Sequence, residues 1–202
     1  PTSRLVPAYV AVEIVELSWD AQIPALLQGK TDIIMSAMTA TDARRVRIDF
    51  SDPYLGEGLS ALLRTDDYLR LRVAGRSIPA TSKVGVQTGT VAEAFARQRF
   101  GPERITAISS PDTAAFELKR KTVDLFITDS ATAIWLASEN EADLSEAPLN
   151  APTEYLAWGI RKGDYEFEDQ VNAILGRWVA EGRLQAIVRG WLGEQFELRN
   201  LR

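Results

Sequence analysis

The chain has 202 residues, enough for one ordinary domain or two small lobes, and 46% of them are hydrophobic and 25% charged, as in a folded globular protein. Its formal net charge is -5, with acidic and basic residues interspersed and no basic stripe, which argues against nucleic acid as a partner. The absence of cysteine and histidine excludes disulfides, thiol nucleophiles and zinc–thiolate sites, together with the commonest metal ligand and general base. We therefore expect neither a metal nor a cofactor.

The sequence offers no segment for crossing a membrane, since no run approaches the about 20 apolar residues that a spanning helix needs. The longest apolar stretches, such as 33–35 and 125–127, have the length of strands. The first residues also lack the basic and apolar regions of a secretory signal. If the protein is exported, we expect that its signal was removed before Pro1.

Strand-like and helix-like segments alternate along most of the chain, which predicts an α/β fold with largely parallel sheet. In the first part we expect, in chain order, a strand at 10–17, a helix at 19–28 capped by Ser18 and ended by Gly29, a strand at 32–36, a single helical turn at 41–46 and a strand at 59–64. The polar stretch 66–81 then predicts an irregular connection.

The second part continues the alternation, and its helices carry clear start signals. Thr90 and Glu93 have the spacing of a capping box, and Ser110 precedes a proline at the first helical position. In chain order we expect a strand at 83–87, a helix at 90–99, a strand at 105–108, a helix at 110–120, a strand at 123–128, a helix that Asp129 caps, a strand at 154–161, and helices at 167–181 and 183–191.

Three segments could bring ligand-binding groups together, and the first runs from Ser36 to Arg44. In it, small residues and hydroxyls, including Ala37 and Thr39, follow a strand and precede an arginine. Small residues let a ligand approach, and an arginine can hold a carboxylate with two parallel hydrogen bonds. From spacing alone, a helix N-terminus with a surface arginine is the alternative interpretation.

The other two segments lie at later strand ends. Gln87 to Thr90, between a strand and a capped helix, offers free backbone N–H groups that favour an anion, although such glycine-containing turns are common and this one is not a phosphate-binding loop. Asp129 ends a buried strand, where open α/β sheets bind ligands. Its alternative role is that of an ordinary helix N-cap, and the two roles can coexist.

Taken together, these motifs resemble one known family. The runs from Trp19 to Ile34, from Met38 to Arg44 and from Ile48 to Tyr54 resemble the family 3 bacterial extracellular solute-binding proteins, the polar amino-acid receptors of ABC transporters. The runs from Val84 to Thr90 and from Val123 to Asp129 follow in the family's order and spacing. The resemblance covers residues 10–193.

The resemblance implies a type II periplasmic-binding-protein fold, in which two lobes with mainly parallel sheets are joined by hinge strands at 54–58 and 153–157. It places lobe 1 at 1–54 with 158–202, and lobe 2 at 55–157. It also implies a protein of the periplasm or the cell exterior, secreted or lipid-anchored, that binds a free α-amino acid between its lobes for the permease of an ABC transporter. Closure of the lobes on binding is a change that such a partner could read.

The same resemblance implies roles for individual residues. Arg44 would hold the ligand α-carboxylate, helped by Thr39 and by the backbone around Thr90, and Asp129 would take the α-ammonium. Ala37 would leave room for the ligand beside them. One fixed cation and one fixed anion complement a zwitterion in a desolvated cleft.

Two further positions would contact the side chain of the bound amino acid. Trp19 stands where related receptors place an aromatic residue over it, although packing at a helix start is the alternative role. Gln87 stands where some relatives carry a lysine. The resemblance therefore points to an amino acid without naming which one.

The chain departs from the family at its start, because only nine residues precede the expected strand at 10–17. Relatives carry a further strand and helix there, and that strand lies centrally in lobe 1 and contributes to the pocket. We therefore expect that the chain is truncated, that another chain fills the gap, or that lobe 1 is remodelled. An unpaired edge would favour dimerisation or strand exchange, and a chain that binds nothing would serve as an interaction domain.

Two other functions compete with transport. Modules of this type also occur in membrane sensor kinases and cell-wall lytic enzymes, so the chain could be the ligand-sensing module of a larger receptor or cell-wall enzyme. Cyclohexadienyl dehydratases share the fold and carry a catalytic glutamate three residues after the position of Asp129. That position is Thr132 here, and threonine cannot protonate a leaving hydroxyl, so we expect a binding protein and not an enzyme.

Overall fold

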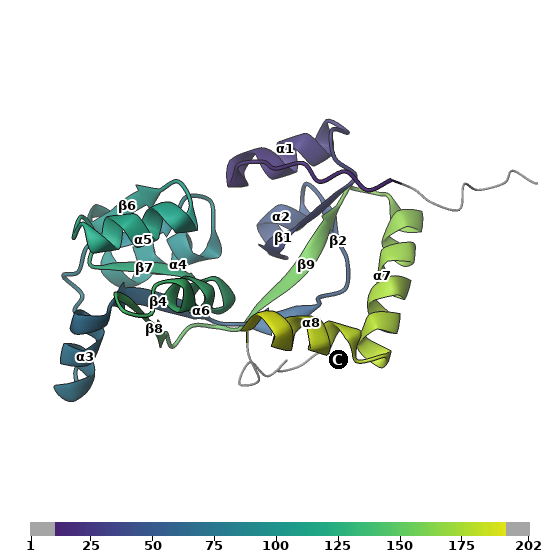
Figure 1. The fold of residues 1–202 in the computed structure, drawn as a ribbon. Helices are drawn as coiled ribbons and strands as arrows, with labels where there is room; N and C mark the ends of the chain where they lie inside the picture. Colours follow the sequence, from purple (N-terminus) through teal and green to yellow (C-terminus); the bar gives the residue numbers. More distant parts are fainter. Residues whose placement is uncertain (1–10, 193–202) are drawn as a thin grey trace, which may run out of the picture.

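The computed structural model describes residues 11–192, which form two α/β bodies, each built around its own sheet (Figure 1). The chain passes from the first sheet to the second near Gly58 and returns between residues 149 and 153. The second body is therefore one continuous stretch of chain, and the first is assembled from the segments on either side of it. The predicted lobe limits, after residue 54 and after residue 157, are not tested by these crossings and stay a prediction.

The sheet of the first body has the order β1-β9-β2, and β3 also pairs with β9. Buried apolar side chains of α1, β1, β2 and β9 form its main cluster, and α7 packs against the end of β9. The strands are β1 (Ile33–Thr39), β2 (Asp49–Phe50), β3 (Leu55–Glu57) and β9 (Glu154–Ile160). The helices are η1 (Trp19–Ala21), α1 (Gln22–Leu27), α2 (Asp42–Arg45), α7 (Tyr165–Ala180) and α8 (Arg183–Leu192).

The sheet of the second body has the order β6-β5-β7-β4-β8. Its strands are β4 (Leu59–Arg64), β5 (Val84–Gln87), β6 (Ile105–Ile108), β7 (Leu125–Asp129) and β8 (Leu144–Pro148). Its helices are α3 (Thr65–Val73), α4 (Val91–Phe100), η2 (Pro102–Arg104), α5 (Pro111–Lys119) and α6 (Ser130–Glu139).

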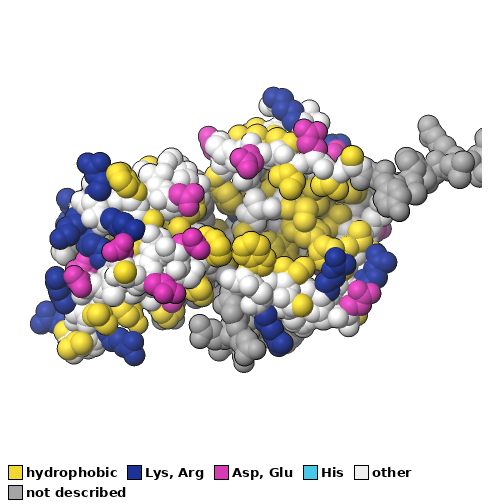
Figure 2. Space-filling view, viewed as in Figure 1, with side chains coloured by type: hydrophobic (Ala, Val, Ile, Leu, Met, Phe, Trp, Pro, Cys, Tyr) yellow, Lys and Arg dark blue, Asp and Glu magenta, His cyan; other side chains and the backbone are white. Residues whose placement is uncertain are grey.

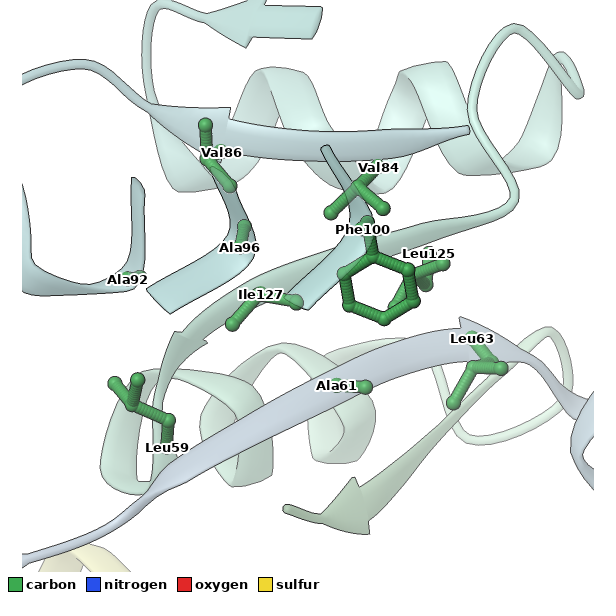
Figure 3. Close-up of a cluster of buried hydrophobic side chains, with 10 residues drawn as sticks. All are labelled: Leu59, Ala61, Leu63, Val84, Val86, Ala92, Ala96, Phe100, Leu125 and Ile127. Carbon is green, nitrogen blue, oxygen red and sulfur yellow. The ribbon is translucent and has the colours of Figure 1, made fainter. Parts of the chain in front are cut away.

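Helices cover both faces of this second sheet, because successive strand residues point to opposite sides. Ala61, Leu125 and Ile127 pack toward Phe100 and the two buried alanines of α4 (Figure 3). Phe126, which lies between two of these residues in β7, packs instead with residues of α5 and α6. This three-layer packing fixes the strand ends of β5 and β7, from which the candidate site is built.

The α/β class is confirmed, but the strands run in mixed orientation. Within residues 11–192, the parallel pairs are β5 with β6 and β5 with β7, and each pairing in the first sheet is antiparallel. The crossings explain much of the difference from the mainly parallel sheets that the alternation predicts. Because β3 carries the chain toward the second body and β9 brings it back, the two must run in opposite directions, as must β4 and β8.

The expected strand at 10–17 is not formed in its described part. Residues 11–18 lie in no helix or strand, and Val12 and Ile14 are 88% and 87% exposed. No strand of the described part pairs with this segment, so its backbone groups have no ladder to join. The alternating pattern favours a half-buried strand, but a strand needs a partner to exist. Val10 lies outside the described residues.

The stretch 66–81, expected to be irregular, begins with most of a helix, α3. Acidic residues occupy its first turn and arginines its last, which complements the helix dipole. Asp67 accepts a hydrogen bond from Arg64 at 2.6 Å and one from Arg70 at 3.4 Å, and Tyr68 and Leu71 pack on the core. Most of the helix faces solvent, so it needs few apolar residues to pack against the core.

Local start signals are confirmed by side-chain geometry. Thr90, Ser110 and Asp129 each accept a hydrogen bond from the backbone N–H three residues later. Ser18 precedes η1 as expected, but its hydroxyl donates to the Asp20 carboxylate and does not cap the backbone. Gly29 lies after α1 with a φ of 69°, the left-handed conformation that ends a helix.

Candidate functional site

A cleft of about 210 Å³ lies between the two bodies and brings together all seven residues predicted for the site. They come from both sides of the cleft: Trp19, Ala37, Thr39 and Arg44 from the first body, and Gln87, Thr90 and Asp129 from the second. Thr132 and Pro111 also line it. Residues up to 113 positions apart in sequence, Trp19 and Thr132, therefore share one small space, which spacing alone could not establish.

Arg44 is the cation of the cleft. Its Nη1 donates to the Thr39 carbonyl at 2.7 Å, and its Nη2 donates across the cleft to the Gly89 carbonyl at 2.9 Å. A guanidinium has five N–H donors, so two such bonds orient it and leave others for a ligand. Burial lowers the pKa of Arg44, and the charge of Glu154 partly offsets this, but a guanidinium remains charged in proteins.

Trp19 covers Arg44 and links the two bodies at the same point. The guanidinium carbon of Arg44 lies 5.2 Å from the Trp19 ring centroid, a cation–π distance, and the indole Nε1 donates to the Gly89 carbonyl at 3.3 Å. The structure thus gives Trp19 a packing role at its helix start and a place on the cleft wall, the two alternatives that the sequence left open.

Asp129 is the anion of the cleft and also an N-cap. Its Oδ1 accepts from the Thr132 N–H at 2.7 Å, and its Oδ2 accepts from the Thr128 hydroxyl at 3.0 Å. The N-cap role is confirmed, and the carboxylate also lines the cleft, so its role toward a ligand stays a prediction.

Gln87 and Thr90 shape the wall at the end of β5. The Gln87 side chain donates to the Ser109 carbonyl at 3.2 Å, and its backbone carbonyl accepts from the Thr90 hydroxyl at 2.7 Å. These bonds hold the turn before α4, whose Gly89 has a φ of 77° that favours glycine. The Gly89 carbonyl is directed toward the first body, where it accepts from both Trp19 and Arg44.

Ala37 lies at an irregularity of β1, where the register with β9 shifts between Ile34 and Met38. Its φ of 53° is unusual for a residue with a side chain, and strained backbone of this kind is concentrated at functional sites. The shift turns the end of β1 into the cleft, so that Ala37 and Thr39 both line it.

A larger cavity of about 560 Å³ adjoins the cleft and shares Trp19, Arg44 and Gln87 with it. Its remaining wall mixes polar and apolar side chains, among them Asp20, Ile23, Met38, Arg47 and Ser109. The two spaces together offer room beyond the groups that hold a ligand's charged ends.

Sequence reasoning missed two titratable groups in the stretch that leads out of the first body: Glu57, which is buried, and Tyr54, which is partly buried. Burial, followed by the charges of Glu57 and Asp129, raises the pKa of Tyr54. Burial, followed by the charge of Asp129, raises the pKa of Glu57 to about 8. The signal was available: a glutamate between two glycines stands in a stretch that was expected to form a hinge strand.

The described part of the chain holds neither a metal-binding cluster of side chains nor a helix that could cross a membrane. Residues 11–192 contain no group of three or more acidic side chains placed to hold a metal ion. Within the same residues, no helix has the length and apolar character needed to cross a membrane.

The chain is similar to known proteins in both sequence and structure. The family model of bacterial extracellular solute-binding proteins, family 3, matches residues 5–194. A probable histidine-binding protein of Campylobacter jejuni is 35% identical over 129 residues, which are 62% of this chain and 48% of that protein. The L-cystine-binding protein TcyJ of Escherichia coli is 25% identical over 175 residues, which are 87% of this chain and 65% of that protein. The chain thus spans about half to two thirds of the length of these relatives.

Other matches extend the range of functions. The membrane-bound lytic murein transglycosylase F of Desulfosudis oleivorans is 27% identical over 81% of this chain and 36% of its own length. The ancestral amino acid-binding protein AncCDT-1, a precursor of cyclohexadienyl dehydratase, has a TM-score of 0.78 and 33% identity over 91% of this chain and 78% of its own. A putative ABC-transporter binding component of Wolinella succinogenes, complexed with lysine, has a TM-score of 0.80 and 26% identity over 95% and 82%. The structural neighbours are type II periplasmic binding proteins. Most of these relatives are amino-acid-binding proteins, some of them of ABC transporters, and one is a lytic transglycosylase.

Proposed function

Because the chain belongs to the bacterial extracellular solute-binding proteins of family 3, we propose that it binds a free α-amino acid in the cleft between its two bodies, on behalf of an ABC transporter. The observation that carries this proposal is the position of one cation, Arg44, and one anion, Asp129, on opposite walls of a cleft of about 210 Å³. A zwitterion needs one partner of each sign at a fixed separation, and a desolvated cleft strengthens both contacts.

Each end of the ligand has suitable partners. The free N–H groups of Arg44 would hold the α-carboxylate, and Asp129 would hold the α-ammonium in a charge-assisted hydrogen bond. The side chain of the ligand would extend past Trp19 and Gln87 into the adjoining cavity of about 560 Å³. That arrangement separates the groups that recognise any amino acid from those that select one.

We further propose that the two lobes comprise residues 1–54 with 158–202, and residues 55–157. The bonds from Trp19 and Arg44 to the Gly89 carbonyl join the two lobes across the cleft. A ligand carboxylate would replace or extend these bonds and favour the closed arrangement, as in hinge-type closure. The extracytoplasmic setting, secreted or lipid-anchored, and the transporter permease as partner follow from the family and belong to this proposal.

No catalytic role is proposed, although one relative is a lytic transglycosylase and another is a precursor of cyclohexadienyl dehydratase. Thr132 lines the cleft at the place where a dehydratase would need an acid, and its hydroxyl cannot supply a proton to a leaving group. A second function, that of a ligand-sensing module, is favoured by the transglycosylase relative, in which the matched region is 36% of a longer protein. Both functions use the same binding site.

The edge of the first body supports a dimer or strand exchange as a further part of the proposal. Among the described residues β1 has β9 as its strand partner and presents its other edge without one, next to an exposed Met35. Figure 2 shows hydrophobic side chains gathered on this body. Unpaired edges favour pairing with another chain. The oligomeric state measured by sedimentation velocity tests this: the wild type should be a dimer, and Met35→Lys, which places a charge at the open edge, should weaken it. A monomeric wild type would contradict the proposal.

Thermal unfolding against the standard amino acids, added singly at millimolar concentration, tests the binding function. A ligand at about 100 times its Kd adds about 2.7 kcal/mol, which raises Tm by roughly 5–10 °C for a chain of this size. Arg44→Ala and Asp129→Ala should each abolish the shift. Arg45→Ala, a change on the same short helix at an exposed position, is the matched control and should keep it. A shift that survives both cleft variants would contradict the proposed pose, and no shift with any amino acid would contradict the function.

A further inference from the structure

Glu57 is a buried carboxyl group directly behind the proposed ammonium site. It ends β3, at the crossing between the two bodies, and is 5% exposed. Its Oε2 accepts from the Ala131 N–H at 2.8 Å, while its Oε1 is buried and has no hydrogen-bond partner among the described residues. A buried oxygen without a partner carries a free-energy cost that calls for an explanation.

Two carboxyl groups converge on the first turn of α6. Glu57 accepts from the Ala131 N–H, and Asp129 accepts from the next one, that of Thr132, at 2.7 Å. The N-terminus of this ten-residue helix carries only about half a positive charge, which balances less than one of the two groups. With both carboxyls ionised, the turn has an excess of negative charge in a buried place.

The groups packed around Glu57 do not supply the missing positive charge. Tyr54, a partly buried phenol, precedes it in the chain, and Glu154 is its opposite neighbour in the β3–β9 register. Glu146 of β8 is connected through Ser60, which bonds to Ser130 at the start of α6. No lysine or arginine of the described part forms an ion pair with Glu57. In the empty cleft, a proton is the simplest compensation.

We propose that Glu57 is a positioning residue for the ligand's ammonium group, which holds a proton while the cleft is empty and releases it when that ammonium binds beside Asp129. This inference rests on the proposed function and adds a second carboxyl to the ammonium subsite. The bound cation would take over the role of the proton, because beside Asp129 it would offset the charge that, with burial, keeps Glu57 protonated. Glu57 would then act through Asp129, whose charge it reinforces only in the occupied site.

Proton release gives ligand affinity a defined pH dependence. The raised pKa of Glu57, about 8 in the empty protein, falls when a cation binds nearby. By linkage, Kd then decreases with rising pH between the pKa of the bound form and about 8, by up to tenfold per unit. The chain has no histidine, the side chain that ordinarily titrates in this window, so the background is low.

Calorimetric titration with the amino acid found by thermal shift tests the inference. Kd is measured at pH 6, 7 and 8, in two buffers of different ionisation enthalpy, so that protons released are counted directly. The wild type should release up to one proton at pH 6–7 and bind at least fivefold more tightly at pH 8 than at pH 6. Glu57→Gln should bind with no pH dependence in this range and no proton release. Glu146→Gln, which removes a neighbouring carboxyl, should retain the wild-type dependence.

The outcomes separate the inference from the function beneath it. A wild-type Kd that is equal at pH 6 and pH 8, with no proton released, overturns the inference and leaves the binding function standing. A Glu57→Gln variant that keeps the full pH dependence also overturns it. Failure of the wild type to bind any amino acid at any pH refutes the function and this inference with it. The proton count uses the wild type alone, so it decides the matter even if the variant does not fold.

Discussion

Glu57→Gln also makes a prediction for the protein without ligand, because a proton held only in the folded state links stability to pH. Burial and the Asp129 charge raise the pKa of Glu57 from 4.5 to about 8. Between these values the folded protein holds up to one more proton at Glu57 than the unfolded chain does. The free energy of unfolding therefore falls as pH rises, by up to about 1.4 kcal/mol per unit.

The stabilising share of this group is complete below pH 4.5 and is lost as pH rises through about 8. By pH 7 the loss amounts to about 3 kcal/mol at most. Glutamine has the shape of the protonated acid, and its amide oxygen can still accept from the Ala131 N–H. We expect Glu57→Gln to be about 1–3 kcal/mol more stable than the wild type at pH 7, a rise in Tm of roughly 2–10 °C, and nearly equal to it at pH 4.5.

Urea unfolding followed by circular dichroism at pH 4.5, 5.5, 7 and 8 measures this difference. The informative quantity is the change of the difference with pH, because all other titrating groups are shared and cancel. A difference that stays constant across the series would show that the Glu57 carboxyl is not protonated in the folded protein. A variant less stable than the wild type at pH 7 would show that a charged carboxylate is satisfied there, which would refute the reasoning at its first step.

Three further predictions concern the framework of the site and share the same urea assay. Phe126→Ala empties the fully buried centre of β7 and should cost about 3–5 kcal/mol; a loss below 1 kcal/mol would contradict the packing. Gly89→Ala places a side chain at a φ of 77° and should cost about 1–2 kcal/mol, whereas an unchanged midpoint would mean that the turn relaxes. Ser110→Ala removes the N-cap of α5 and should cost about 1 kcal/mol, and no loss would show that the hydroxyl's bond to the Thr113 N–H contributes nothing.

The parts of the fold that could be predicted from sequence are those decided within a few residues. The caps at Thr90, Ser110 and Asp129 form because a hydroxyl or carboxylate reaches an N–H three residues away. The turn at Gly182, between α7 and α8, forms because glycine adopts a φ of 69° without strain. Such signals need no knowledge of the remaining fold.

Strand orientation and the segment 11–18 depend on partners that are far away in the sequence. The alternation of Val12 and Ile14 indicates which face of a strand would be buried, but it does not indicate whether a neighbouring strand is present to pair with it. The direction of β9 relative to β3 follows from the chain leaving one body and returning to it, a property of the topology that periodicity does not record. The helix α3 was missed for a different reason: its ion pairs lie within three residues, but with Tyr68 and Leu71 on the core it has too few apolar residues for a clear apolar stripe.

The candidate site divides along the same line. Arg44 and Asp129 could be named because each stands at or after the end of a strand, where α/β folds gather ligand groups, and because the resemblance implied roles for them. Glu57 stands out in the sequence as a glutamate between two glycines, but its role depends on β3 packing against the first turn of α6, 74 residues later in the chain. A glutamate that violates the ordinary rule against buried, unpartnered charge is where local reasoning fails, and such failures concentrate at functional sites. The misfit is therefore itself the reason to look for a proton at Glu57, and for the cation that would displace it.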